Sequence, residues 1–211
     1  MKNYFRGKFI TFEGCDGCGK STQLKMFADY LSANKIPHIF TREPGGGKIS
    51  ECIREIILDG RNGEMTDECE ALLYAAARVQ HIHDRVEPAL KEGKIVICDR
   101  YIDSSFAYQA YARGLGFDFI VDINSYAVKN YLPDITIFID LSPEEAFSRK
   151  HGADENDRME QAGADFHARV YEGYKKLLKK YPDRIRAVDG RKTPNEVFDE
   201  ILSALKEKCC L

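Results

Sequence analysis

The sequence lacks tryptophan, long apolar runs and an excess of either charge. Its apolar segments, such as IVIC and ITIFI, are short and none exceeds seven residues, whereas a transmembrane helix needs about 20. Lys and Arg number 31 against 34 Asp and Glu, which gives a net charge of −3 and argues against a basic surface that coats nucleic acid. The N-terminal stretch MKNYFRGKFITFEG lacks the apolar core of a secretion signal. We therefore expect neither a membrane nor a nucleic acid as partner.

Cysteine is present at a moderate level, with seven residues in 211. The odd count and low density do not fit a disulfide scaffold, so we expect reduced thiols and a cytoplasmic location. Cys15 and Cys18 form a C-x-x-C pair, but a zinc site would need a second pair, and Cys52, Cys69 and Cys98 are isolated. The tail CCL is not a C-a-a-X box, because lysine precedes the two cysteines.

The length predicts one domain over residues 1–211. Apolar, β-branched runs predict strands at 8–13, 38–42, 94–99, 134–140 and 184–189. Helical periodicity follows each of them, most clearly in Leu24, Phe27, Ala28 and Leu31, in the stripe from Val197 to Leu205, and over about 66–92, 103–130 and 159–181. This alternation predicts an α/β fold with a doubly wound, five-stranded parallel sheet and helices on both faces. Ligands of such sheets bind beyond the carboxyl ends of the strands.

Residues 14–21 read GCDGCGKS and match the phosphate loop G-x-x-x-x-G-K-[ST]. A strand precedes the loop and a helix follows it, which is the context that the motif requires and that a chance glycine-rich turn would lack. The backbone N–H groups of such a loop hold a polyphosphate, Lys20 contacts its β and γ phosphates, and the Ser21 hydroxyl ligates Mg²⁺. The residues expected to bind the nucleotide are Gly14, Cys15, Asp16, Gly17, Cys18, Gly19, Lys20, Ser21 and Thr22.

Asp16 is unexpected in a loop that binds only a triphosphate. A carboxylate about 8 Å from a phosphate charge costs roughly 2 kcal/mol at an effective dielectric near 20. Two interpretations are open: Asp16 accepts a hydrogen bond from a hydroxyl of a second substrate, or it points into solvent.

Three further segments place polar groups at predicted strand ends or on adjoining helices. TREPGGG puts Glu43 and Pro44 in a turn after the second strand. Asp99 and Arg100 follow the third, where an acid suits a magnesium partner and an arginine can fork onto a phosphate. Tyr74 and Arg78 share one helix face at i, i+4; together they could read a base, since a donor-only arginine favours a carbonyl over an amino group. Taken alone, each has a more ordinary interpretation, since Arg–Asp pairs are usually surface bridges and a helical tyrosine usually lies in the core, but all three converge on the same edge of the sheet.

The chain contains, in order, GCDGCGKSTQ, TREPGG, LLYAAARVQ, CDRY followed by SSFAYQ, and PDITIFIDLSPEEAFSRK. In this order and spacing the segments resemble the thymidylate kinase family, the bacterial dTMP kinases among the P-loop nucleoside monophosphate kinases. The resemblance covers about residues 8 to 205. It implies a homodimeric enzyme that converts dTMP to dTDP, in dTTP synthesis, with ATP as phosphoryl donor and Mg²⁺ as cofactor.

The resemblance also implies roles for single residues. Asp16 would meet the 3′-hydroxyl of dTMP, which would account for its place in the loop. Tyr74 would stack on thymine and Arg78 would bond its O4. Arg100 would bind the acceptor phosphate, with Asp99 near magnesium. The remaining residues that the resemblance places at the acceptor are Glu43, Pro44, Ser105 at the thymine edge, Tyr108 near the sugar C2′, and Gln109 in the same segment.

A short lid is expected at about 149–160. Family members whose phosphate loop has no arginine resemble one another in carrying lid arginines, and this loop has none. Arg149 and Arg158 are therefore the candidates for stabilising charge in the transition state. Two alternatives remain from the sequence: a kinase of this architecture with another acceptor, or a nucleotide switch that transfers no phosphoryl group. The switch lacks support, because N-K-x-D, which reads guanine in GTPases, is absent.

Overall fold

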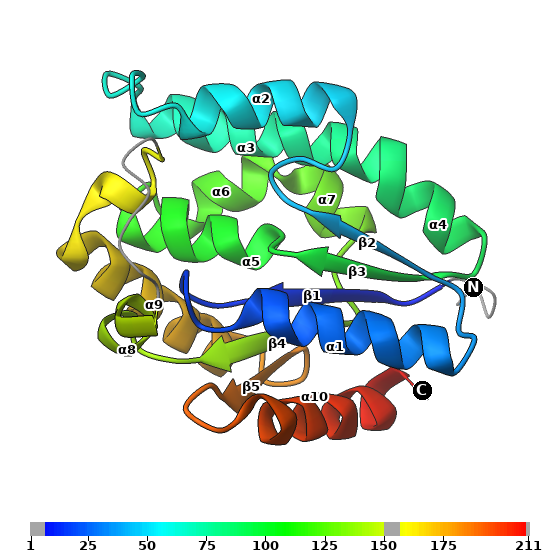
Figure 1. Cartoon of the computed structure of the whole chain (residues 1–211). Coiled ribbons are helices and arrows are strands. Elements are labelled where there is room, and N and C mark those ends of the chain that lie inside the picture. The colour runs from blue at the N-terminus through cyan, green and yellow to red at the C-terminus, as the bar shows by residue number, and fades with distance from the viewer. Residues whose placement is uncertain (1–6, 150–156, 210–211) are drawn as a thin grey trace.

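The centre of the protein is a parallel β-sheet. The computed structural model describes residues 7–149 and 157–209, and within them five strands pair in the order β2-β3-β1-β4-β5 (Figure 1). All four pairings are parallel. This confirms the predicted fold class, and the observed strands lie within one residue of the predicted ones: β1 Phe9–Glu13, β2 His38–Arg42, β3 Ile95–Asp99, β4 Ile135–Asp140 and β5 Ile185–Asp189.

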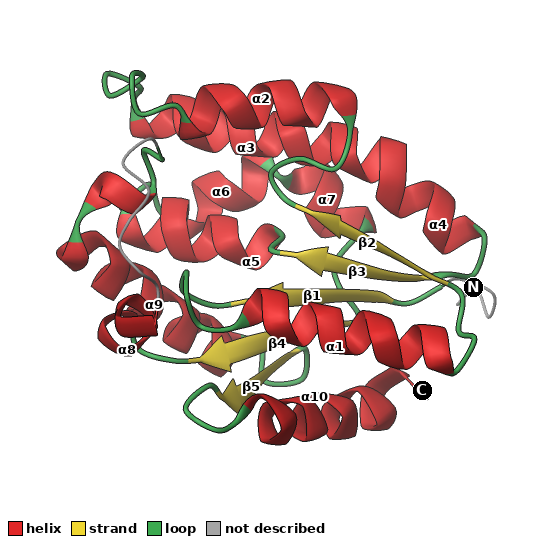
Figure 2. Ribbon diagram, viewed as in Figure 1, coloured by secondary structure: helices red, strands yellow, loops and turns green. Residues whose placement is uncertain are grey.

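Two helices cover one face of the sheet. Side chains of Ile10, Ile97 and Ile137 point to this face and pack against α1 (Lys20–Ala33) and α10 (Pro194–Cys209). In Figure 2, α1 crosses in front of the strands and α10 lies below them. Both helices carry the apolar stripe that the sequence predicts, because residues three or four apart share one helix face.

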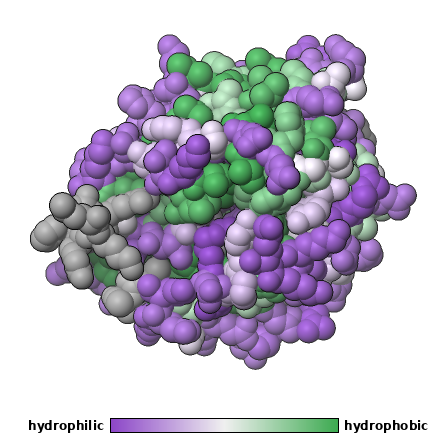
Figure 3. Space-filling view, turned by 180° about the vertical axis from the view of Figure 1, so that it is seen from behind, coloured by the Kyte–Doolittle hydropathy of each residue, from purple (hydrophilic) through white to green (hydrophobic). Residues whose placement is uncertain are grey.

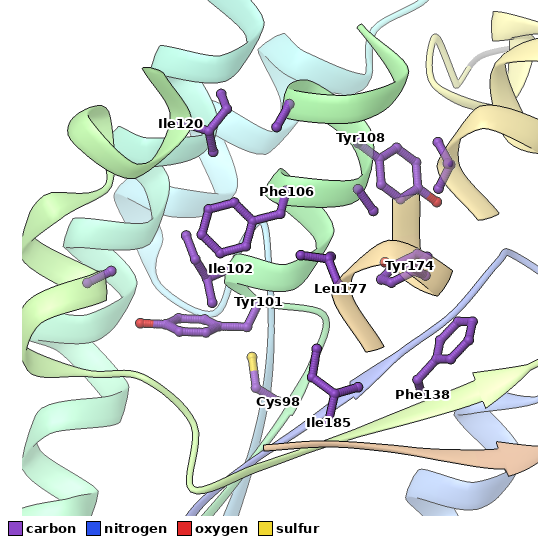
Figure 4. Packing of buried hydrophobic residues seen from close by; sticks show 14 of the residues in the cluster. Cys98, Tyr101, Ile102, Phe106, Tyr108, Ile120, Phe138, Tyr174, Leu177 and Ile185 are labelled. Atoms are coloured by element: carbon purple, nitrogen blue, oxygen red, sulfur yellow. The ribbon is translucent and has the colours of Figure 1, made fainter. Parts of the chain in front are cut away.

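The other face carries a larger helical layer. Phe9, Cys98 and Phe138 alternate with the residues of the first face, as strand geometry requires, and pack with aromatic residues from the helices behind the sheet. Figure 4 shows Tyr101 and Phe106 from one side of this layer and Tyr174 from the other. The central strands β1, β3 and β4 are thus buried on both faces, which explains why they read as nearly continuous apolar runs.

The first two of the three long predicted helical stretches are divided into several helices in the structure. The first consists of α3 (Asp67–His81), a π-helical turn at Ile82–Val86 and α4 (Glu87–Lys91). The second consists of α5 (Ile102–Ser105), a π-helical stretch at Phe106–Ala112, α6 (Phe117–Ile123) and α7 (Ser125–Asn130). Gly114 and Gly116, with φ of 78° and 84°, separate α6 from the π-helical stretch, because glycine adopts positive φ at little cost.

The third predicted stretch becomes a 3₁₀ turn at Glu160–Ala162 and α9 (Ala164–Lys180). Two helices were not predicted: α8 (Pro143–Arg149) and α2 (Lys48–Leu58), which packs on α3 outside the sheet layers. Among residues 7–149 and 157–209, none of the helices has both the length and the apolar character that a membrane crossing requires.

A buried polar network ties the helical layer to the sheet. Asp103 on α5 is fully buried and accepts from both terminal nitrogens of Arg184, Nη1 at 2.6 Å and Nη2 at 2.7 Å. The same carboxylate accepts from Thr136 on β4 at 2.8 Å, and Thr136 lies 2.8 Å from Thr11 on β1. These bonds fix α5, and hence the turn before it, against the strands.

Candidate functional site

The phosphate loop lies at the carboxyl end of β1, between Glu13 and the first residue of α1. Gly14, Gly17 and Gly19 have φ of 140°, 86° and 100°, which explains the need for glycine at these positions. A Cβ on Gly14 would also lie 2.8 Å from the Ile139 carbonyl oxygen. The Lys20 ammonium donates to the carbonyls of Gly14 and Cys15, both at 3.1 Å. The loop therefore closes around the ammonium group of Lys20.

A cavity of about 370 Å³, here called the loop cavity, opens beside this loop. Six of the nine predicted nucleotide-binding residues line it: Asp16, Gly17, Gly19, Lys20, Ser21 and Thr22. Cys15 and Cys18 instead direct buried thiols into the core beneath the loop. Burial, with Cys18 nearby, raises the pKa of Cys15 to about 12, so this thiol stays protonated and unreactive at neutral pH.

Asp99, at the end of β3, also lines the loop cavity together with Ser21. Its Oδ1 is buried and has no hydrogen-bond partner among the described residues. An unpaired buried carboxylate oxygen is costly, and a hard cation would satisfy it. The pair of Asp99 and Ser21 thus fits Mg²⁺, although the described residues contain no cluster of three or more His, Cys, Asp or Glu that could hold a metal alone.

A second cavity of about 140 Å³, here called the helix cavity, adjoins the first. The sequence predicted nine acceptor-site residues, and all nine line it: Asp16, Glu43, Pro44, Tyr74, Arg78, Arg100, Ser105, Tyr108 and Gln109. They come from the phosphate loop, the turn after β2, α3, the turn after β3, α5 and the π-helical stretch. Residues far apart in sequence thus meet beyond the carboxyl ends of the strands.

Arg78 is the most enclosed cation of the helix cavity, with 2% of its surface exposed. Its Nε donates to Glu43 at 2.7 Å, and Nη1 donates to Ser105 at 3.0 Å and to Asn124 at 2.6 Å. Nη2 donates to the Tyr101 carbonyl at 3.2 Å. These bonds use four of the five N–H hydrogens of a guanidinium, so Arg78 is held rigidly with one Nη2 hydrogen left for a ligand carbonyl.

Arg100 stands where the two cavities meet and lines both. Its φ of 65° is left-handed, which is strained for a residue with a side chain and is typical of functional sites. Nη2 donates to Asp16 at 2.7 Å, and the guanidinium lies 5.3 Å from the centre of the Tyr108 ring. Asp16 and Arg100 therefore form a charged pair on the wall shared by the loop cavity and the helix cavity.

Comparison with known proteins shows the family to which the chain belongs. A family model described as "Thymidylate kinase" matches residues 12–201. A thymidylate kinase from Clostridium novyi is 50% identical over 203 residues, which cover 95% of this chain and 99% of that protein. The thymidylate kinase of Bacillus velezensis is 47% identical over 95% of this chain and 96% of its own length. That of Thermoanaerobacter is 46% identical over 96% of this chain and 98% of its own length.

The chain belongs to the thymidylate kinase family. Membership confirms the resemblance that the sequence motifs indicate, and with it an ATP-dependent phosphotransferase that acts on dTMP. The two adjoining cavities are what such a thymidylate kinase needs, because donor and acceptor must meet for direct transfer.

The predicted lid arginines lie outside both cavities. Residues 150–156 of the expected lid fall outside the described residues. Arg158 donates through Nη2 to the buried carboxylate of Glu70 at 2.6 Å, and through Nε to the Ile57 carbonyl at 3.0 Å. Arg149 donates to the Gly190 carbonyl at 2.8 Å. Neither arginine is among the residues that line the loop cavity or the helix cavity.

Sequence reasoning missed several residues of the site. Arg54 on α2 lines both cavities and donates to the Pro44 carbonyl at 3.0 Å. The i, i+3, i+4, i+7 spacing of apolar residues in 49–57 would have revealed α2. Glu70 and His81 share α3 with Tyr74 and Arg78, and a period of about four residues relates them.

His81 and Glu70 support the residues that line the helix cavity. His81 is buried between two partners. Its Nδ1 lies 2.8 Å from Oε1 of Glu43, and its Nε2 lies 2.6 Å from Oγ1 of Thr41. Glu70 accepts from Gln109 at 2.8 Å. Two residues of α3 therefore fix side chains that line the helix cavity: His81 fixes the carboxylate of Glu43, which binds Arg78, and Glu70 fixes the amide of Gln109.

Proposed function

We propose that the residues of the two cavities carry out the transfer of the γ-phosphoryl group of ATP to dTMP, which yields dTDP. The observation that carries this proposal is the shared wall, where Asp16 and Arg100 line both the loop cavity and the helix cavity. Two anions must approach each other for in-line transfer, so the work of the protein is positioning and charge neutralisation.

The chain supplies opposite charges for both anions. Lys20 and the backbone N–H groups of the phosphate loop would hold the triphosphate of ATP. Arg100 and Arg54 would neutralise the monophosphate of the acceptor. The attacking phosphate oxygen is already ionised near neutral pH, so the reaction requires no general base.

The helix cavity would select the acceptor. Tyr74 would stack on thymine, and the remaining Nη2 hydrogen of Arg78 would be donated to thymine O4. Cytosine has an amino group at this position, which cannot accept a hydrogen bond from Arg78. Ser105 and Gln109 would contact the base edge, and Asp16 the 3′-hydroxyl. Tyr108, whose hydroxyl is buried with no partner among the described residues, would disfavour a ribose. Glu43 and Pro44 would complete the wall.

Ser21 and Asp99 would hold Mg²⁺, as the unpaired Oδ1 of Asp99 supports. Magnesium would supply positive charge beside the phosphates. The residues of the chain keep the roles given above: they bind, orient and shield the two nucleotides.

An assay of acceptors tests the proposal. With ATP and Mg²⁺, we expect ADP formation that depends on dTMP, with weaker activity on dUMP and little on dCMP, AMP or GMP. Each acceptor is compared at equal concentration, with ADP release as the measurement. Faster turnover of another monophosphate would indicate a kinase with a different acceptor. ATP binding without dTMP-dependent ADP would indicate a nucleotide switch.

The lid arginines lead to a separate prediction. The buried ion pair with Glu70 favours Arg158 as an anchor and leaves Arg149 as the candidate for charge stabilisation in the transition state. We expect Arg149→Met to lower kcat by about a hundredfold while the Kd for ATP changes little. Arg158→Met should change kcat much less than Arg149→Met, because Arg158 is paired with Glu70 and lies outside both cavities. Unchanged kcat in both arginine variants would remove both residues from the mechanism.

We also propose that the protein forms a homodimer through α2 and α3. Ile49, Ile56, Leu72 and Val79 on these helices are each 42 to 53% exposed. The back view in Figure 3 shows apolar residues gathered in its upper half, the half in which α2 and α3 lie in Figure 1. A contiguous apolar surface of this kind marks an interface.

Charge placed on this surface should separate the subunits. We expect Leu72→Glu with Val79→Glu to reduce the mass measured by sedimentation equilibrium from that of two chains to that of one. Leu132→Glu is the matched control, because Leu132 is 40% exposed but lies outside α2 and α3. A double variant that still sediments as a dimer would place the interface elsewhere.

A single domain over residues 1–211 and a cytoplasmic location complete the proposal. One sheet supports both core clusters, and Cys15, Cys18, Cys52, Cys69 and Cys98 are free thiols, as a reducing compartment would keep them.

A further inference from the structure

Glu13 is a fully buried carboxylate that the transfer mechanism does not use. It ends β1, directly before the phosphate loop, and none of its surface is exposed. Four donors surround it. Its Oε1 accepts from the backbone N–H groups of Tyr101 at 2.8 Å and Ser104 at 3.2 Å, and its Oε2 accepts from the hydroxyls of Ser104 at 2.6 Å and Tyr174 at 2.7 Å.

The two hydroxyls connect Glu13 to Arg100. Ser104 Oγ and Tyr174 Oη each lie 3.3 Å from Nη1 of Arg100. A hydroxyl has one hydrogen to donate and lone pairs to accept with. Because each hydroxyl donates its hydrogen to Glu13, its lone pairs are available to Nη1. The carboxylate thus determines how both hydroxyls face the guanidinium.

The backbone bonds act on the same residue. Tyr101 and Ser104 flank the start of α5, and Arg100 directly precedes them with its strained φ of 65°. By accepting both N–H groups, Glu13 holds the turn in which this strain is stored. Tyr174 reaches the site from α9, on the far side of the core (Figure 4). One side chain therefore joins the strand before the phosphate loop, the turn that carries Arg100 and a third element.

We propose that Glu13 is a positioning residue for Arg100, which it holds through Ser104 and Tyr174 in the orientation that receives the acceptor phosphate. Asp16 fixes Nη2 from the loop side, and the two hydroxyls fix Nη1 from the core side. A guanidinium held at both ends loses little freedom when the phosphate arrives, so less binding energy is lost in ordering it. This inference rests on the proposed function, in which Arg100 binds the phosphate of dTMP.

The surroundings of Glu13 are unlike those of a carboxylate retained for stability alone. Burial, together with the nearby carboxylate of Asp103, raises the pKa of Glu13 to about 7, while Arg100, Ser104 and Tyr174 act in the opposite direction. Two buried carboxylates that repel each other are unfavourable for folding. Groups with such shifts gather at functional sites.

Paired binding measurements on dTMP and thymidine test the proposal. Thymidine fits the same base and sugar contacts but has no phosphate for Arg100 to hold. We expect Glu13→Gln, and Tyr174→Phe to a smaller degree, to raise the Kd for dTMP about tenfold while the Kd for thymidine changes less than about twofold. The glutamine amide would donate to the two hydroxyls and turn their hydrogens toward Arg100. Tyr171→Phe is the matched control, because Tyr171 lies on the same helix and donates to Asp140 outside this network.

A double-mutant cycle separates the inference from the proposed function. In a protein that already carries Arg100→Met, the addition of Glu13→Gln should cause no further loss of dTMP affinity. Additive losses, or equal losses for dTMP and thymidine, would show that Glu13 supports only the fold. If Glu13→Gln fails to fold, Ser104→Ala and Tyr174→Phe apply the same test, and unchanged dTMP binding in both would overturn the inference. If Arg100→Met itself does not discriminate dTMP from thymidine, the phosphate assignment of the proposed function fails instead.

Discussion

Replacement of Arg100 with methionine is expected to lower kcat/KM for dTMP by about a thousandfold, which corresponds to roughly 4 kcal/mol of transition-state stabilisation. Methionine keeps much of the length of the side chain and removes the charge at the wall between the two cavities. The carboxylate of Asp16, now 2.7 Å from Nη2 of Arg100, would then face the phosphates without a partner. Steady-state measurement of dTMP-dependent ADP formation gives both kcat and KM.

Two comparisons sharpen this prediction. Arg100→Lys should fall between the wild type and Arg100→Met, because lysine restores the charge but not the planar fork. The Kd for ATP should change much less than kcat, since Lys20 and the loop amides hold the donor. Unchanged turnover of Arg100→Met at saturating dTMP would show that this arginine does not act on the acceptor.

The second large effect concerns stability. We expect Arg184→Met to lower the free energy of unfolding by about 3–5 kcal/mol, because it leaves the fully buried carboxylate of Asp103 without its charged partner. Urea denaturation measures the change in midpoint. A double variant with Asp103→Asn should recover part of the loss, since it removes the unpaired charge.

Arg61→Met provides the control for this measurement. Arg61 also pairs with a carboxylate, that of Asp59, but its side chain is 90% exposed. Exposed pairs contribute little, so the midpoint of this variant should match the wild type. A midpoint for Arg184→Met equal to that of Arg61→Met would mean that the buried pair contributes nothing measurable.

The parts of the fold that the sequence predicts are those in which neighbouring residues carry the information. The strands β1, β3 and β4 are recognisable because both of their faces are buried, and the partly exposed edge strand β2 was still predicted with its exact bounds. The phosphate loop is local as well. Tyr74 and Arg78 reach the helix cavity because one helical turn separates them. The other residues predicted at the acceptor site were identified from the motifs of the family, because periodicity alone does not place them there.

The parts that sequence reasoning missed depend on contacts between distant segments. Glu70 pairs with Arg158 across 88 positions, and Tyr174 meets Glu13 across 161. No local pattern marks Glu13 as the acceptor of four hydrogen bonds, since an acid at a strand end usually faces solvent or a ligand. The π-helical stretch at Phe106–Ala112 adds an extra residue to a turn, which a search for the 3.6-residue period does not detect.

The central claim is that the two cavities hold a triphosphate and a monophosphate at the same time, with Arg100 between them. A crystal structure of the protein with dTMP and a non-hydrolysable ATP analogue tests it most directly. The account predicts the triphosphate on the loop from Gly14 to Ser21, thymine between Tyr74 and Arg78, and the dTMP phosphate on the guanidinium of Arg100. A dTMP phosphate bound away from Arg100, or a helix cavity left empty at saturating dTMP, would contradict it.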